Sequence, residues 1–238
     1  MGRAPGHLPL AGSAVSHPPY LPPAGSKERA PLPDELIAIL DALITIGHPR
    51  LVEANDGWRD ICIPAASFAV EVLKAFGISA KPLPVQVLVT TADAWEEALR
   101  GELPATGYSL GIGFGDPMPG RYGGHLVVLV ENTVLLDLTL DQADRPNRDI
   151  RLHPEWFGPI DPDFVSGIEV AIAFGGVDPP IRIGYYRIPS DDPQATSWRK
   201  SPYWAKRGQL KPVIGTVIRE IRASLASRIE HQTEVETS

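Results

Sequence analysis

The chain has 238 residues, with 22 basic and 29 acidic side chains and a formal net charge of −7. Because an acidic chain repels a phosphate backbone, the charge argues against nucleic acid as the main partner. A hydrophobic fraction of 43% allows a sizeable core, and the single cysteine excludes an internal disulfide and any zinc site built from several cysteines. No apolar run approaches the roughly 20 residues that cross a bilayer, so we expect a cytoplasmic protein that does not bind membranes.

Residues 1–33 hold eight of the 25 prolines. Neighbouring prolines cannot support a helix, so this segment is predicted to be a disordered leader. From Asp34 onward, apolar residues recur at helical spacing as far as Gly47 and Pro49, which should end the helix. A loop is therefore expected over residues 48–60.

A second helix is expected to begin near Cys62. Pro64 fits the first turn of a helix, where its missing N–H costs nothing. Gly77 ends the apolar face that follows. A strand over 83–89 and a short helix over 91–100 are expected next.

Residues 107–124 are rich in glycine, which raises the question of a phosphate-binding loop. No Gly-Lys-Ser/Thr follows, and the prolines in Asp116-Pro117-Met118-Pro119 block the helix that a dinucleotide-binding fingerprint must open. We therefore predict a bendable loop here. No cofactor and no metal site are expected.

Two strands that are apolar on both faces follow, over 125–130 and 134–140. This pattern predicts a central hairpin that is covered on each side. Two further strands are expected over 168–174 and 181–188.

The end of the chain carries an amphipathic helix, whose apolar face holds Ile214, Val217, Ile218, Ile221 and Leu225. Residues 229–238 are expected to be frayed. The elements together predict a single α+β domain over residues 34–228.

Cys62 lies at the expected N-terminus of an apolar helix, just after a polar loop. Exposed N–H groups and the positive end of the helix dipole stabilise a thiolate at such a position. For a lone cysteine, a buried structural role is the simpler interpretation, so its placement alone does not decide between the two.

His125 and Asp137 supply the partners that a nucleophilic cysteine needs. His125 opens a central strand after two glycines that leave space beside its ring, and Asp137 lies among leucines, where an unpaired carboxylate is costly. The alternatives are a hydrogen-bonded core histidine and a solvent-facing strand acid. Taken with Cys62, however, the three residues occur in the order of a nucleophile, a base and an orienting acid, which is the arrangement of a catalytic triad.

The segments that carry these residues resemble the transglutaminase-like proteins. Cys62 and the helix after it, which ends in Leu73-Lys74-Ala75-Phe76-Gly77-Ile78-Ser79-Ala80, look like that family's nucleophile helix. His125-Leu126-Val127-Val128-Leu129-Val130 and Leu136-Asp137-Leu138-Thr139 look like its histidine strand and its Asp-Pro-Thr strand. The resemblance covers about residues 55–141. The arylamine acetyltransferases share this order of residues, but their arginine-rich phrase before the cysteine is not found here.

The resemblance implies a papain-like α+β fold, in which the nucleophile helix packs on an antiparallel sheet. It also implies acyl chemistry on a peptide, amide or ester, through a thioester that is passed to water or to an amine. The oxyanion would be bound by the backbone N–H of Cys62 and by one upstream donor. Trp58 and Asn55 are the candidates for that donor, although Trp58 could equally be a packing aromatic.

The triad hypothesis makes a geometric prediction about the hairpin. Side chains alternate faces along a strand, so paired residue numbers must sum to an even value if His125 and Asp137 are to share a face. A three-residue loop over 131–133 satisfies this condition and makes the two residues diagonal neighbours. Asn132 tolerates the left-handed conformation that such a loop needs. A two-residue loop would place the two side chains on opposite faces.

Two other classes of function stay open. A non-catalytic domain could keep the papain-like fold and bind a partner through the leader or the tail. Aromatic and basic residues also alternate in Trp198-Arg199-Lys200 and Tyr203-Trp204-Ala205-Lys206-Arg207, a pattern that can stack on single-stranded nucleic acid. The oligomeric state is not set by the sequence.

Overall fold

The computed structural model describes residues 32–55, 62–91, 94, 109–113, 122–143, 152, 155–160 and 181–236. The proline-rich leader up to residue 31 and the strand expected over 168–174 lie outside these residues. So does the helix expected over 91–100, apart from Thr91 and Ala94.

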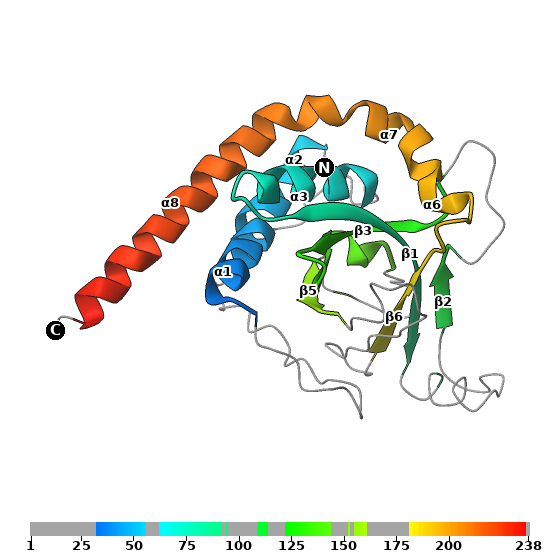
Figure 1. The fold of residues 1–238 in the computed structure, drawn as a ribbon, viewed down its shortest axis with the longest axis horizontal. Coiled ribbons are helices and arrows are strands. Elements are labelled where there is room, and N and C mark those ends of the chain that lie inside the picture. Colours follow the sequence, from blue (N-terminus) through cyan, green and yellow to red (C-terminus); the bar gives the residue numbers. More distant parts are fainter. Residues whose placement is uncertain are drawn as a thin grey trace, which may run out of the picture.

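The described part of the chain is α+β, with helices packed against an antiparallel sheet (Figure 1). The helices are α1 (Asp34–Ala42), α2 (His48–Ala54), α3 (Cys62–Lys74), α6 (Gln194–Ser197), α7 (Pro202–Ala205) and α8 (Lys211–Glu236). The strands are β1 (Ala80–Thr91), β2 (Ser109–Ile112), β3 (His125–Val130), β4 (Val134–Asp137), β5 (Trp156–Pro159) and β6 (Ile181–Arg187). Their order is β2-β1-β3-β4-β5, and β6 also pairs with β1. The fold class expected from the sequence, α+β with an antiparallel sheet, is confirmed.

The β3–β4 hairpin has the register that the triad hypothesis requires. Val130 pairs with Val134, which leaves a three-residue loop over 131–133. Glu131 and Asn132 both adopt the left-handed conformation, with φ values of 48° and 54°. The expectation of a left-handed Asn132 is therefore confirmed, and the conformation extends to one residue more than predicted.

The two faces of this hairpin pack into different cores. Even-numbered residues of β3 and β4 join buried residues of α1, α3 and α8 in what we call the helix core, which includes Leu126, Val128, Leu136, Phe68 and Ile221. Odd-numbered residues join β1 and β6 in what we call the sheet core, which includes Val127, Leu135, Val85, Ile183 and Tyr185. Every residue of β3 and β4 is buried, so the prediction of a hairpin covered on each side is confirmed.

The first helical segment does not end at Gly47 and Pro49, so the expectation of a loop was wrong over 48–54. α1 continues through a π-helical turn, Leu43–Gly47, into α2. Pro49 lies in the first turn of α2, where its missing N–H is not needed. Gly47 has a helical φ of −72° and serves close packing instead, because a Cβ there would lie 3.3 Å from the ring of Phe68.

Three other element boundaries differ from the sequence-based expectations. β2 lies inside the glycine-rich segment expected to be a loop, because its backbone pairs with β1 over residues 87–90. β4 ends at Asp137, and a 3₁₀ turn over Leu140–Ala143 takes the place of the longer strand expected there. α8 continues to Glu236, through most of the segment expected to be frayed.

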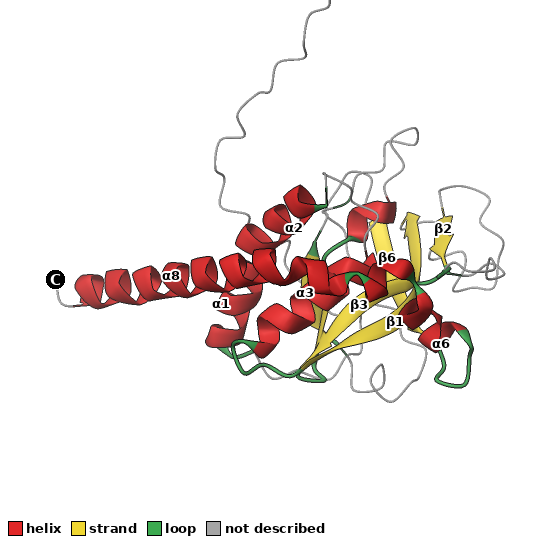
Figure 2. Cartoon of the chain, turned by 90° about the horizontal axis from the view of Figure 1, so that it is seen from above, coloured by secondary structure: helices red, strands yellow, loops and turns green. Residues whose placement is uncertain are grey.

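α8 packs on the body of the molecule as far as Leu225. Val217 and Ile221 are fully buried in the helix core, and Arg50 of α2 donates to the carboxylate of Glu220 at 2.9 Å. The C-terminal part of the helix extends past the other elements (Figures 1 and 2), and Ile229 there is 64% exposed. Within the part of the chain that the structure describes, α8 and the shorter helices all fall short of the length or apolarity needed to cross a membrane.

Candidate active site

Cys62 is the first residue of α3. The helix is anchored by the buried side chains of Phe68, Ala69, Val72 and Leu73 in the helix core. Cys62 itself is half-buried and forms no disulfide. The start of a helix presents N–H groups that lack helical partners, and these favour a negatively charged sulfur.

His125 and Asp137 form a buried pair at the ends of the two central strands. His125 Nε2 lies 2.8 Å from Asp137 Oδ2, and the two side chains are 1% and 0% exposed. Because an ionised carboxylate only accepts hydrogen bonds, Nε2 carries the proton that this contact requires. The contact predicted from the hairpin register is therefore confirmed.

The second ring nitrogen of His125 is not used by Asp137. Nδ1 is buried and has no partner in hydrogen-bond geometry within the described part of the chain. The Cys62 thiol is nevertheless close enough to the ring to influence its pKa. Burial lowers the pKa of His125, but the charge and hydrogen bond of Asp137, and then those of Cys62, outweigh this effect and raise the pKa to about 10. The environment therefore favours an imidazolium beside the sulfur.

The Asp137 carboxylate is surrounded by donors, which compensate for its complete burial. The backbone N–H of Thr139 donates to Oδ1 at 2.9 Å, and the Tyr185 hydroxyl donates to Oδ2 at 3.0 Å. Burial, followed by the charge and the hydrogen bond of Asp137, raises the pKa of Tyr185 well above its usual value. Tyr185 therefore stays protonated and remains a donor.

Tyr122 closes the site on the side of Gly123 and Gly124. Its hydroxyl donates to the carbonyl oxygen of His125 at 2.8 Å. A Cβ at Gly124 would lie 2.7 Å from that hydroxyl, so the space that this glycine leaves is filled by the tyrosine. Burial, and then the charge of Cys62, raises the pKa of Tyr122, which shows that the phenol also lies near the sulfur.

The sequence offered two candidates for the second oxyanion donor, Trp58 and Asn55. Trp58 lies outside the described residues. Asn55 is at the end of α2, and its side-chain amide donates to the carbonyl of Leu51 at 2.8 Å. One amide hydrogen of Asn55 is thus used to cap its own helix, and its role at the oxyanion stays a prediction.

Sequence reasoning did not identify Tyr122, Tyr185 or the role of Thr139 at the site. The Thr139 contact has a local signal, because an aspartate often accepts a hydrogen bond from the N–H two residues later. Tyr122 has a weaker signal in the glycine pair that follows it. Tyr185 has none, because it reaches Asp137 from a strand 48 residues farther along the chain.

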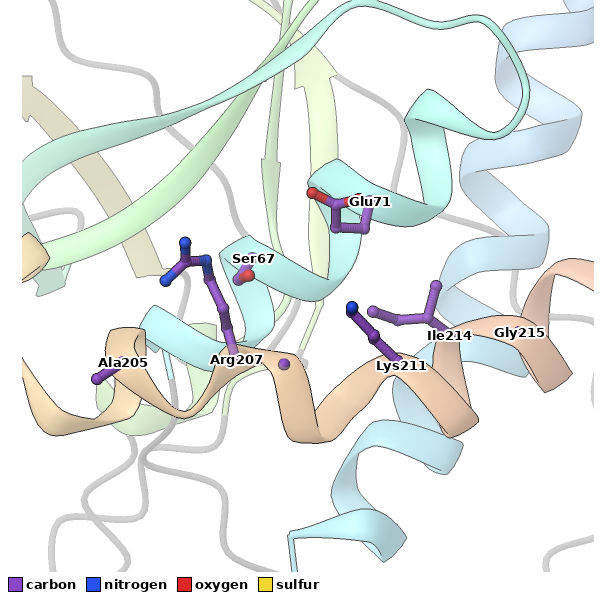
Figure 3. Close-up of a pocket in the computed structure, with 8 residues that line it drawn as sticks. Ser67, Glu71, Ala205, Arg207, Lys211, Ile214 and Gly215 are labelled. Atoms are coloured by element: carbon purple, nitrogen blue, oxygen red, sulfur yellow. The ribbon is translucent and has the colours of Figure 1, made fainter.

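A pocket of about 500 Å³ lies on the side of α3 that faces α7 and α8 (Figure 3). Its lining does not include Cys62, His125 or Asp137 and consists of Ser67, Glu71, Ala205, Arg207, Gly208, Lys211, Ile214 and Gly215. It is therefore separate from these three residues.

The aromatic and basic segment over 198–207 is largely engaged with itself. The rings of Trp198 and Trp204 meet edge to face at 4.7 Å. Arg199 lies 4.8 Å from the centre of the Trp198 ring, and Arg207 lies 4.4 Å from that of Trp204. Trp198 is only 3% exposed, whereas Tyr203 of the same segment is 43% exposed. Trp198 is therefore too buried for a base to stack on it.

No protein-family model matches the chain, and no match is found among curated proteins or among solved structures. Among the residues that the structure describes, no three histidine, cysteine, aspartate or glutamate side chains are grouped so that they could hold a metal ion. What the site can do is therefore inferred from its own geometry.

Proposed function

We propose that the chain is a cysteine-dependent acyl-transfer enzyme with a papain-like, transglutaminase-like fold. Cys62 would attack an amide or ester of a peptide or small molecule and form a thioester, which water or an amine then resolves. The observation that carries this proposal is the buried pair of His125 and Asp137, 2.8 Å apart. Among the described residues the other ring nitrogen has no hydrogen-bond partner, and Cys62 is close enough to the ring to raise the pKa of His125.

In the first half of the reaction, the Cys62 thiolate attacks the carbonyl carbon and a C–S bond forms. The carbonyl oxygen takes the negative charge and is stabilised by the backbone N–H of Cys62. When the tetrahedral intermediate collapses, the C–N or C–O bond breaks. The leaving group takes the proton from His125, which becomes neutral.

In the second half, neutral His125 takes a proton from water or from an amine. The resulting nucleophile attacks the thioester carbonyl, and the C–S bond breaks. The sulfur leaves as a thiolate beside the protonated ring, so the starting state is restored. Throughout the cycle, Asp137 holds the Nε2–H of His125 and keeps the ring in one orientation.

The lone cysteine makes the experiment specific to one site. Wild-type protein and the His125→Gln variant are treated with p-nitrophenyl acetate at pH 6, and nitrophenol release and acetylation of Cys62 are measured by absorbance and mass spectrometry. We expect acetylation to be slower by about two orders of magnitude in the variant, because glutamine can neither take the proton of the thiol nor place a positive charge beside the sulfur.

His48→Gln is the matched control, because His48 is a second buried histidine, in α2, whose ring lies 3.7 Å from the Glu155 carboxylate. It should acetylate like the wild type. The acetylation rate of Asp137→Asn should lie between those of the wild type and His125→Gln, because the base remains but loses its orienting carboxylate. Wild-type acetylation no faster than that of a simple thiol would refute the proposal and would favour a non-catalytic binding domain.

A further inference from the structure

One oxygen of the Asp137 carboxylate is shared between two donors. Oδ2 accepts from His125 Nε2 at 2.8 Å and from the Tyr185 hydroxyl at 3.0 Å, whereas Oδ1 accepts from the Thr139 N–H at 2.9 Å. Each donor withdraws negative charge from the oxygen that it contacts. The support that Asp137 gives to His125 therefore depends on whether Tyr185 is also donating.

The packing around Tyr185 does not by itself require a hydroxyl. Tyr185 is 0% exposed, and its ring stacks on Trp156 of β5 with centroids 5.9 Å apart and planes 18° from parallel. A phenylalanine would fill the same space without a buried hydroxyl that needs a partner. Tyr185 belongs to β6, and the Trp156 on which its ring stacks belongs to β5. The packing of these two strands therefore sets the position of the hydroxyl beside Asp137.

We propose that Tyr185 is a positioning residue, whose hydroxyl fixes the Asp137 carboxylate against the His125 ring and limits how strongly Asp137 holds the ring's proton. This inference rests on the proposed function, because Tyr185 acts through Asp137 on His125, the base that the proposed reaction uses with Cys62. Without the hydroxyl, Oδ2 would direct more of its charge at His125, and the ring would give its proton to a leaving group less readily.

The groups that face His125 come from four parts of the chain. Cys62 lies at the start of α3, Tyr122 precedes β3, and Asp137 ends β4, while Tyr185 of β6 acts on the ring through Asp137. Burial raises the pKa of both tyrosines, so they stay neutral. Within the described part of the chain, Cys62 and Asp137 are therefore the groups that bring negative charge to the ring.

The experiment follows His125 itself by ¹⁵N NMR of the ring nitrogens and by the resonance of the proton between Nε2 and Asp137. In Tyr185→Phe, we expect that proton to move downfield and the pH at which His125 loses its charge to rise by roughly half a unit to one unit. Tyr186→Phe is the matched control, because Tyr186 is the next residue of β6 and points to the opposite face. It should leave both values unchanged.

Site-specific 3-fluorotyrosine at position 185 provides a second test that does not depend on the folding of Tyr185→Phe. Fluorine makes the phenol a stronger donor, so both His125 values should move in the opposite direction. If the values in both Tyr185 variants equal those in Tyr186→Phe, or if both move in the same direction, the proposal is overturned. A different result would refute only the acyl-transfer proposal: slow acetylation of wild-type Cys62, while the His125 values still move in opposite directions in Tyr185→Phe and in the 3-fluorotyrosine protein. The coupling of Tyr185, Asp137 and His125 would then stand.

Discussion

The two faces of the β3–β4 hairpin are equally buried but differ in chemistry. Leu136 and Asp137 are neighbours in β4, and both are 0% exposed. Leu136 packs into the apolar helix core, whereas Asp137 faces the sheet core and bonds to His125 and Tyr185. An apolar side chain stabilises the fold by its burial alone, but a buried carboxylate is costly unless every oxygen is satisfied. The helix core therefore contributes to the stability of the fold. The buried carboxylate of Asp137 on the other face is better explained by its role in the proposed reaction.

The largest effect should come from Leu136→Ala, which tests whether the two faces are independent. Removal of a fully buried leucine leaves a cavity in the helix core and should lower the free energy of unfolding by about 2–5 kcal/mol. Urea denaturation measures this loss. In the folded variant, the pH at which His125 loses its charge, a property of the polar face, should equal that of the wild type. A shift of that pH together with the loss of stability would show that the faces are coupled.

A second effect is expected in the pH dependence of stability, which belongs to the polar face. The pKa of His125 is raised in the folded protein to about 10, from about 6.5 in an unfolded chain. The stabilisation from its protonated form should therefore be complete below about pH 6.5 and be lost as the pH rises towards 10.

Urea denaturation at several pH values, for the wild type and for His125→Gln, measures this contribution. The difference in unfolding free energy between the two should be greatest near pH 6 and should shrink as the pH rises. Leu136→Ala should keep the wild-type pH dependence, because it changes only the apolar face. A constant difference between wild type and His125→Gln would contradict the assigned ion pair.

The smallest effect should come from the loop that sets the register of both faces. Asn132 has a φ of 54°, a conformation that alanine adopts less readily, so Asn132→Ala should lower the free energy of unfolding by roughly 1 kcal/mol. Thr133→Ala, at the next loop position, serves as the control and should cost less. Thermal denaturation distinguishes them. An equal loss in both variants would show that the left-handed conformation is not what Asn132 contributes.

Local features of the sequence predicted the elements that carry Cys62, His125 and Asp137. The apolar pattern predicted the two strands, and the requirement that His125 and Asp137 share a face predicted the three-residue loop that the structure has. Pro64 and the apolar spacing after it located the start of α3 at Cys62. These features depend on backbone geometry over a few residues, which the chain specifies without help from distant segments.

Long-range packing decided what those local patterns could not. Gly47 looks like a helix end, but the approach of Phe68 makes it a close-packing position inside a continuing helical segment. Residues 109–112 form the strand β2 only because their backbone pairs with that of β1. Tyr185 became part of the site because β6 pairs with β1 and brings its hydroxyl to Asp137. In each case the deciding partner is remote in sequence, so no local period or turn signal reports it, and only the tertiary structure brings the two groups together.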